Sequence, residues 1–195
     1  MDDPMTMDLH QQMVLTHYNE YWGLATEVVR LAFSDAPQAA PFVAEFRLGS
    51  DAEPLYVYAT IGMSSLPMPN VAGDRRAELF IYANLHSDEL RQSLALLAIY
   101  PFQHNLALSL LDTIYGSRAL VEGSQLTSVL LTMPLREPED FAVLDTGDAA
   151  VQFMLVTPIT ESERRLCLAE GSFALLGLLA ETGADIADLG RQGVI

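Results

Sequence analysis

The sequence contains no lysine and a single cysteine. The lone Cys167 cannot form a disulfide within the chain, and this scarcity is typical of proteins in a reducing compartment. All ten basic residues are arginines, set against twenty-six aspartates and glutamates, so the net charge is −16. A chain this acidic repels phosphate backbones and anionic lipids, which disfavours nucleic-acid binding and membrane binding through a basic surface.

Long apolar segments are missing as well. The run 173–180 is eight residues long, whereas a helix that spans a membrane needs about twenty. The chain begins Met1-Asp2-Asp3, which is acidic where an export signal would be basic. We therefore expect a cytoplasmic protein with no membrane association.

Apolar residues make up 50% of the 195 residues, enough to bury a core without metal or disulfide cross-links. No repeat or linker divides the chain, so we expect one domain over residues 1–195 with its core at about 10–190. The acidity has two interpretations. It either attracts a basic partner and accelerates association, or it only keeps the protein soluble.

Three segments have the spacing and end signals of helices. The first covers about 7–21, with Leu9, Met13 and Tyr18 on its inner face and Gly23 as its stop. The second starts at the N-cap Ser87 and ends before Pro101, since a residue preceding proline is pushed out of the helical region. The third starts at a Thr160–Glu163 capping box and runs to about 181. Its predicted inner face contains Leu166, Phe173, Leu176 and Ala180.

Short apolar segments that are β-branched or aromatic predict strands. They lie at 42–48, 55–62, 78–83, 125–133 and 151–157, while 26–33 is ambiguous between strand and helix. Loops are expected at 34–41, 65–76 and 136–149. Helices and strands do not alternate regularly, so we expect an α+β fold with a mixed, largely antiparallel sheet and helices packed on it.

Candidate catalytic and metal-binding motifs are weak. The histidines at 10, 17, 86 and 104 have no metal-ligand spacing with Cys167 or an acidic residue. Ser64 follows a glycine as in a nucleophile elbow, but Leu66 replaces the second glycine. Cys167 lies within a predicted helix, where a buried thiol packs as a small hydrophobe. Glu137, Glu139 and Asp140 are expected in a solvated loop. We therefore predict no catalytic residue, no metal site and no cofactor.

Several segments, taken in order, resemble the suppressor-of-fused family over about residues 10–190. The matching segments are Tyr58-Ala59-Thr60-Ile61-Gly62-Met63-Ser64, Ala77-Glu78-Leu79, Leu94-Ala95 through Tyr100-Pro101-Phe102, Gly123-Ser124, Leu130-Leu131-Thr132-Met133-Pro134, and Val151 through Glu163. The resemblance implies an α+β domain that binds proteins without catalysis. Eukaryotic members restrain a transcription factor by holding a short extended peptide. Bacterial single-domain members, which this chain resembles in length and in its lack of lysine, are regarded as immunity proteins against partner toxins.

The resemblance also implies two partner-binding residues. A tyrosine after the second helix and an aspartate twelve positions later contact the peptide in eukaryotic members, and Tyr100 and Asp112 have this relation here. An aspartate accepts charge-assisted hydrogen bonds from a basic or histidine-bearing ligand, and the peptide would join a sheet edge as a strand. Without a partner role, Tyr100 would only pack at the helix end and Asp112 would only organise a turn. The eukaryotic peptide lies between two domains, whereas this chain is expected to form one.

The leading hypothesis is therefore a non-enzymatic immunity-type protein. It would neutralise a toxin or effector with a basic surface by binding it directly. Two alternatives stay open: a regulatory or scaffold protein that binds a transcription-factor peptide, and an enzyme whose active site has no recognised motif. A pocket of clustered polar residues around Ser64, His104 or Asp112 would favour the enzyme. The sequence does not indicate the oligomeric state.

Overall fold

The computed structural model describes residues 6–31, 41–116 and 118–195, and a single eight-stranded sheet organises this part of the chain. The strands are β1 (Glu27–Arg30), β2 (Phe42–Gly49), β3 (Pro54–Ile61), β4 (Arg76–Ala83), β5 (Thr113–Tyr115), β6 (Ser128–Thr132), β7 (Val143–Asp145) and β8 (Ala150–Ile159). The helices are α1 (Leu9–Trp22), α2 (Asp88–His104), α3 (Glu161–Glu170) and α4 (Ser172–Thr182). Short 3-10 turns lie at Met63–Ser65 and Glu139–Ala142.

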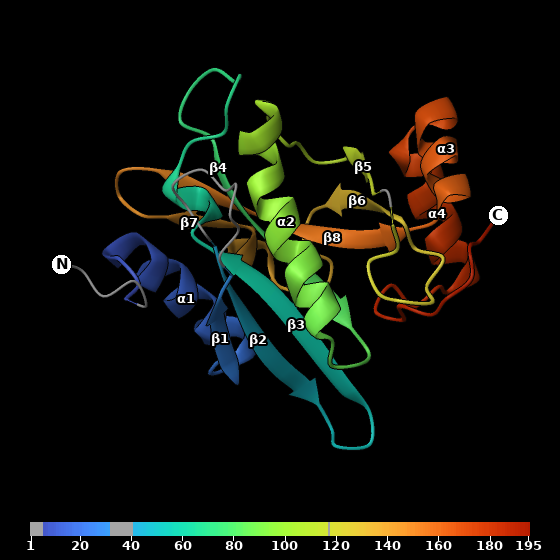
Figure 1. The fold of residues 1–195 in the computed structure, drawn as a ribbon, viewed down its shortest axis with the longest axis horizontal. Helices are drawn as coiled ribbons and strands as arrows, with labels where there is room; N and C mark the ends of the chain where they lie inside the picture. The colour runs from blue at the N-terminus through green and yellow to red at the C-terminus, as the bar shows by residue number, and fades with distance from the viewer. Residues whose placement is uncertain (1–5, 32–40, 117) are drawn as a thin grey trace.

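The strand order is β1-β2-β3-β4-β8-β6-β5, and β7 pairs with β8 outside this path (Figure 1). The β4–β8 pair is parallel. The other pairs are antiparallel. This arrangement confirms the predicted α+β class and its mixed, largely antiparallel sheet.

Helices cover both faces of the sheet (Figure 1). On one face, α2 contributes Leu90, Leu94 and Ala98 to a core with apolar side chains of β4, β6 and β8. On the other face, α1 packs on β2, β3 and β4, and α3 and α4 pack over Leu130 and Ile159. β4 and β8 are consequently buried on both faces along most of their length, as their unbroken apolar sequence predicts.

Side-chain caps fix the starts of three helices. The Thr160–Glu163 capping box before α3 and the N-cap at Ser87 before α2 are confirmed. α1 has a capping box of its own, in which Asp8 accepts the Gln11 amide and the Gln11 side chain returns to the Asp8 amide. Each cap satisfies amides that the first turn of a helix leaves without partners.

Three predictions about the helices are wrong. Tyr18 is buried as predicted, but the rest of the buried face of α1 is Val14, His17 and Trp22, and the predicted Leu9 is 74% exposed. α2 continues through Pro101 to His104, since Ile99 and Pro101 are buried in its last turn and tertiary packing outweighs the local penalty of proline. The third helix breaks at Gly171, which has φ 92°. This break changes the phase of α4, so Leu175 and Leu179 are buried while Phe173 and Ala180 are exposed.

The five predicted strands are present, with shifted ends. The ambiguous segment 26–33 forms β1 over Glu27–Arg30. Of the predicted loops, 34–41 lies outside the described residues except for Pro41, while 136–149 contains the unpredicted β7. β5 was also unpredicted, because a strand of three residues depends on its neighbour rather than on its own pattern. Within the described residues, no helix combines the length and apolarity needed to cross a membrane.

Candidate functional site

Within the described residues, β5 forms one end of the strand order and pairs only with β6. Gly116 N–H donates to Thr127 O, and Leu131 N–H donates to Asp112 O. In an antiparallel pair, the backbone N–H and C=O groups of successive residues point alternately toward the partner strand and away from it. Those of Ile114 therefore point toward β6, and those of Thr113 and Tyr115 point away from the sheet. This edge therefore offers unpaired backbone donors and acceptors to another chain.

A β-bulge precedes this edge. Leu111 and Asp112 together oppose Leu131, since Leu111 N–H donates to Leu131 O at 2.7 Å and Leu131 N–H donates to Asp112 O at 3.0 Å. Leu111 has φ 72°, a left-handed conformation that glycine normally adopts in this kind of bulge. Ser172 Oγ donates to Leu111 O at 2.8 Å, which ties the bulge to the start of α4. The strained bulge turns Asp112 to the end of β5.

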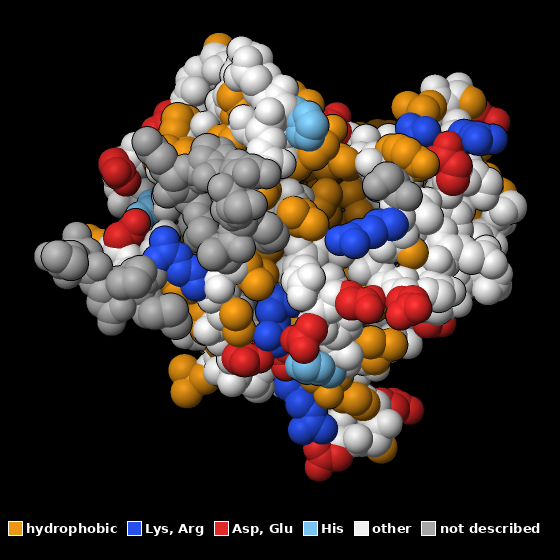
Figure 2. Space-filling view, in the orientation of Figure 1, with side chains coloured by type: hydrophobic (Ala, Val, Ile, Leu, Met, Phe, Trp, Pro, Cys, Tyr) orange, Lys and Arg blue, Asp and Glu red, His pale blue; other side chains and the backbone are white. Residues whose placement is uncertain are grey.

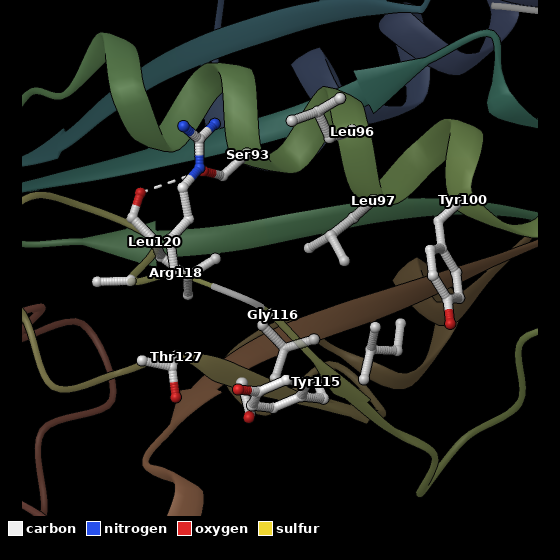
Figure 3. A pocket seen from close by; sticks show the side chains of 13 residues that line it. Ser93, Leu96, Leu97, Tyr100, Tyr115, Gly116, Arg118, Leu120 and Thr127 are labelled. Carbon is white, nitrogen blue, oxygen red and sulfur yellow. Dashed lines mark hydrogen bonds between the residues drawn. The ribbon is translucent and has the colours of Figure 1, made fainter.

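A groove runs along this edge between α2 and β5, where Figure 2 shows a hollowed apolar area. It consists of two adjoining hollows of about 200 and 330 Å³, both lined by Tyr100 and Ile114. Leu96 and Leu97 of α2 and Ile114 of β5 form apolar walls of the first hollow (Figure 3). Tyr115 also lines it, and its ring lies beneath the Arg164 guanidinium of α3 at 5.2 Å. Cys167 and Leu168 of α3 reach the second. The groove therefore follows the open edge from the α2 face to the α3 face.

The structure brings Tyr100 and Asp112, the two predicted partner-binding residues, to the same hollow. Tyr100 is half-buried and lies against the His104 ring, with centroids 4.4 Å apart. Asp112 is exposed, and its Oδ2 accepts the Ser109 amide at 2.7 Å. Asp112 therefore does organise a turn, and its other carboxylate oxygen accepts no hydrogen bond from the described residues. Whether these two side chains also bind a partner stays a prediction.

Ser64 lies in a different, closed polar cluster. Its Oγ donates to Glu78 Oε1 at 2.6 Å and lies 2.9 Å from His10 Nε2. Glu78 is fully buried and also accepts from Thr60 Oγ1 and from the amides of Gly62 and Ser64. Serine thus stands between histidine and carboxylate, whereas a hydrolase triad places histidine in the middle. Ser64 is 0% exposed, so the cluster connects α1 to β3 and β4 rather than presenting a nucleophile.

Burial raises the pKa of Glu78 to about 7, against the opposing effect of its hydrogen bonds from Ser64, Thr60 and Gly62. All four donors point at the carboxylate oxygens, an arrangement that suits the ionised form. Desolvation therefore outweighs the hydrogen bonds, which leaves a buried carboxylate that titrates near neutrality.

A family model described as suppressor of fused protein matches residues 42–192. The chain belongs to the suppressor-of-fused family. No curated protein matches the sequence.

Solved structures of this family share the fold. A protein described as a suppressor-of-fused homologue from Neisseria gonorrhoeae superposes with a TM-score of 0.78 at 21% identity, over 95% of this chain and 97% of the other. A chain of a Sufu–Fu complex gives 0.74 at 13% identity, over 95% and 92%. Drosophila Suppressor of Fused gives 0.72 at 15% identity over 97% of this chain. This chain covers only 54% of the Drosophila protein.

The acidic group nearest to a metal-binding geometry already holds an arginine. Ligand atoms of Glu27, Glu45 and His86 lie within 4.8 Å of one another. The Arg91 guanidinium lies between the two carboxylates, at 2.6 Å from Glu27 and 2.8 Å from Glu45. A cation would have to displace this buried guanidinium, so the group is best described as an ion-pair network that ties α2 to β1 and β2.

Two other expectations about polar side chains have different outcomes. Glu137 was expected in solvent, but its Oε1 accepts from Trp22 Nε1 at 3.0 Å and from the Tyr82 hydroxyl. The prediction of a fully solvated loop is therefore wrong at Glu137, because an aromatic cluster reaches it, while Glu139 and Asp140 are exposed. Cys167 is 7% exposed, which confirms its burial, and desolvation raises its pKa.

Sequence reasoning missed the open edge of β5, the bulge at Leu111 and the position of Arg118 at the groove. One signal was available: Thr113-Ile114-Tyr115 is a β-branched and aromatic run between Asp112 and Gly116. A run this short predicts a strand only when a pairing partner is known.

Proposed function

We propose that the protein binds an extended segment of a partner protein, which pairs with the outer edge of β5 and places its side chains in the groove beside α2. The observation that supports this most strongly is the open edge itself. Backbone groups at Thr113 and Tyr115 that have no partner in the described part of the chain adjoin an apolar groove. Main-chain pairing with pockets for alternate side chains is how sheets bind peptides.

The identity of the groove walls supports a protein ligand. Tyr115 is 58% exposed and Leu168 is 66% exposed, although leaving large apolar side chains in water costs free energy. Exposed aromatic side chains beside an apolar groove are typical of protein interfaces. Asp112 supplies an acceptor for a basic or histidine-bearing residue of the partner.

We propose further that the partner has a basic surface and that the protein neutralises it, as an immunity protein neutralises a toxin. The net charge of −16 supports this role, because complementary charge accelerates association. The regulatory alternative is favoured by the solved Sufu–Fu complex, in which a protein of the same fold has a protein partner. Co-expression with the product of an adjacent gene separates the two: rescue of growth supports immunity, and its absence with altered transcription supports regulation.

The experiment compares Tyr115→Pro with Tyr115→Val as bait for proteins of the native cell. Both variants lose the aromatic ring, but only proline removes the outward N–H, and proline is tolerated on edge strands. We expect a partner that wild type and Tyr115→Val both retain and that Tyr115→Pro loses, with similar melting temperatures for the two variants. Equal retention by Tyr115→Pro, or no protein retained by wild type, contradicts the proposal.

A further inference from the structure

Arg118 lies at the end of the groove opposite Asp112. It is exposed and lines the hollow formed by Ser93, Leu97 and Tyr115 (Figure 3). It also lines an adjoining hollow near Glu89. Its guanidinium therefore stands where a strand on the β5 edge would leave the apolar part of the groove.

Arg118 differs from the other arginines of the described chain. Six of them pair with carboxylates: Arg47, Arg76, Arg91, Arg164, Arg165 and Arg191. Arg75 donates to Leu108 O, and Arg30 and Arg136 lie over aromatic rings. Arg118 has none of these partners among residues 6–31, 41–116 and 118–195. In a chain with twenty-six acidic residues, a guanidinium without a carboxylate is conspicuous beside a binding groove.

Two carboxylates share the adjoining hollow with Arg118, those of Glu89 and Glu122, and among the described residues neither forms a salt bridge with it. Glu89 Oε2 accepts the Glu122 amide at 2.7 Å instead. As far as the described residues go, the groove consequently presents a cation without a carboxylate partner at the Arg118 end and a carboxylate at the Asp112 end, with Leu97, Ile114 and Tyr100 between them.

The length of the groove sets the spacing of the ligand. Tyr100 and Ser93, which mark its two ends on α2, are separated by about 10 Å at the helical rise of 1.5 Å per residue. An extended chain advances about 3.3 Å per residue and directs alternate side chains to the same face. Because only every second side chain faces α2, the shortest same-face spacing that covers this length is four positions, about 13 Å, so the first, third and fifth side chains of a segment on the β5 edge face α2.

We propose that the partner segment carries an acidic residue that pairs with Arg118, four positions away from a basic or histidine residue that meets Asp112, with an apolar residue midway. This inference rests on the proposed function, since it assumes a strand on the edge of β5. Either direction of that strand gives the same spacing, and the order of the two charges reports whether the strand is parallel or antiparallel.

The test selects short random displayed peptides on wild type and on Arg118→Glu. Arg47→Glu is the matched control, because it makes the same change of charge at an exposed residue of β2, away from the groove. On wild type and Arg47→Glu we expect peptides with Asp or Glu four positions from Lys, Arg or His. On Arg118→Glu we expect the acidic position to become basic, and affinity for the wild-type peptides to fall about tenfold.

Two outcomes overturn the inference: selected peptides without an acidic residue at a fixed position, or unchanged affinity of those peptides for Arg118→Glu. The proposed function fails in a different way. If the selected peptides bind Tyr115→Pro as tightly as they bind Tyr115→Val, the edge of β5 is not their site, whatever charges they carry.

Discussion

The middle of the sheet at β4 and its edge at β5 treat polar groups in opposite ways. Around Glu78, in the closed cluster, four donors converge on one carboxylate and no atom of Glu78 reaches solvent. At the β5 edge, the outward backbone groups of Thr113 and Tyr115, the Arg118 guanidinium and one oxygen of Asp112 have no partner among the described residues. A converging set of polar residues is usually the mark of an active site. Here the converging set is structural, and the open, dispersed set is the better candidate for function.

A buried ion pair likewise differs from the groove, because its polar groups are enclosed and have partners. Arg191 and Glu163, beneath α3, are 7% and 0% exposed and form two hydrogen bonds of 2.7 and 3.0 Å. Glu163 also accepts the Thr160 and Val194 amides. These contacts fasten the C-terminal segment to the start of α3. We expect variants of such enclosed groups to lower stability, and variants at the β5 edge to lower binding.

The largest expected effect follows Arg191→Met. The substitution leaves the Glu163 carboxylate buried without its guanidinium, which costs about 3–5 kcal/mol of unfolding free energy. The matched double variant Arg191→Met/Glu163→Leu removes both charges and should recover part of the loss in urea unfolding. A double variant that is less stable than the single one would show that the pair does not act as a unit.

Glu78→Ala comes next, since it leaves the amides of Gly62 and Ser64 without an acceptor inside the protein. We expect a loss of about 3 kcal/mol in urea unfolding. Glu78→Gln keeps one acceptor oxygen for both amides and should lose about half as much. Equal losses in the two variants would mean that the volume of the side chain matters and its hydrogen bonds do not.

The pH dependence of stability gives a third, smaller effect. Burial raises the pKa of Glu78 from 4.5 to about 7, so between these values the folded state binds more protons than the unfolded state, and stability falls as pH rises. Glu163 has the opposite sign. Burial opposes its ionisation, but hydrogen bonds from Arg191, Thr160 and Val194 outweigh burial and lower its pKa, so its contribution is lost as pH falls below 4.5.

Glu78→Gln separates these two contributions. In this variant the decline of stability between pH 4.5 and 7 should be reduced, while the loss at lower pH should remain. Melting temperatures measured across this range check the prediction, and an unchanged decline in Glu78→Gln would assign it to another group.

The smallest effect on stability is expected for Asp112→Asn at the β5 edge. The asparagine oxygen can still accept the Ser109 amide, so the unfolding free energy should change by less than about 0.5 kcal/mol. Affinity for peptides selected on wild type should fall, because the carboxylate that receives their basic residue is gone. Asp112→Ala, which also loses the turn hydrogen bond, should cost about 1 kcal/mol. Full affinity of Asp112→Asn would place the peptide elsewhere.

Sequence reasoning succeeded where local chemistry decides the structure. The Thr160–Glu163 capping box and the N-cap at Ser87 are contained in four-residue segments, and both are present. The mixed sheet followed from the order of apolar segments. Reasoning failed where distant residues decide: Pro101 remains helical because the core holds its turn, and β5 exists because β6 pairs with it.

The candidate site was predictable only in part. Tyr100 and Asp112 came from the family resemblance, and the structure places both in one groove. No pattern in the sequence shows that Arg118 faces this groove or that Thr113 and Tyr115 direct their amides outward, because these properties arise from strand order. Conversely, Ser64 looked like a weak catalytic motif, and only the fold shows it enclosed beside Glu78.

Amide hydrogen exchange of the β5 edge tests the central claim most directly, measured residue by residue with and without a peptide selected on wild type. We predict that the Thr113 and Tyr115 amides exchange rapidly in the free protein and become protected in the complex, while the Gly116 amide, which donates to Thr127 O, is protected in both. Protection of Thr113 and Tyr115 in the free protein, or rapid exchange of both in the saturated complex, would contradict the account.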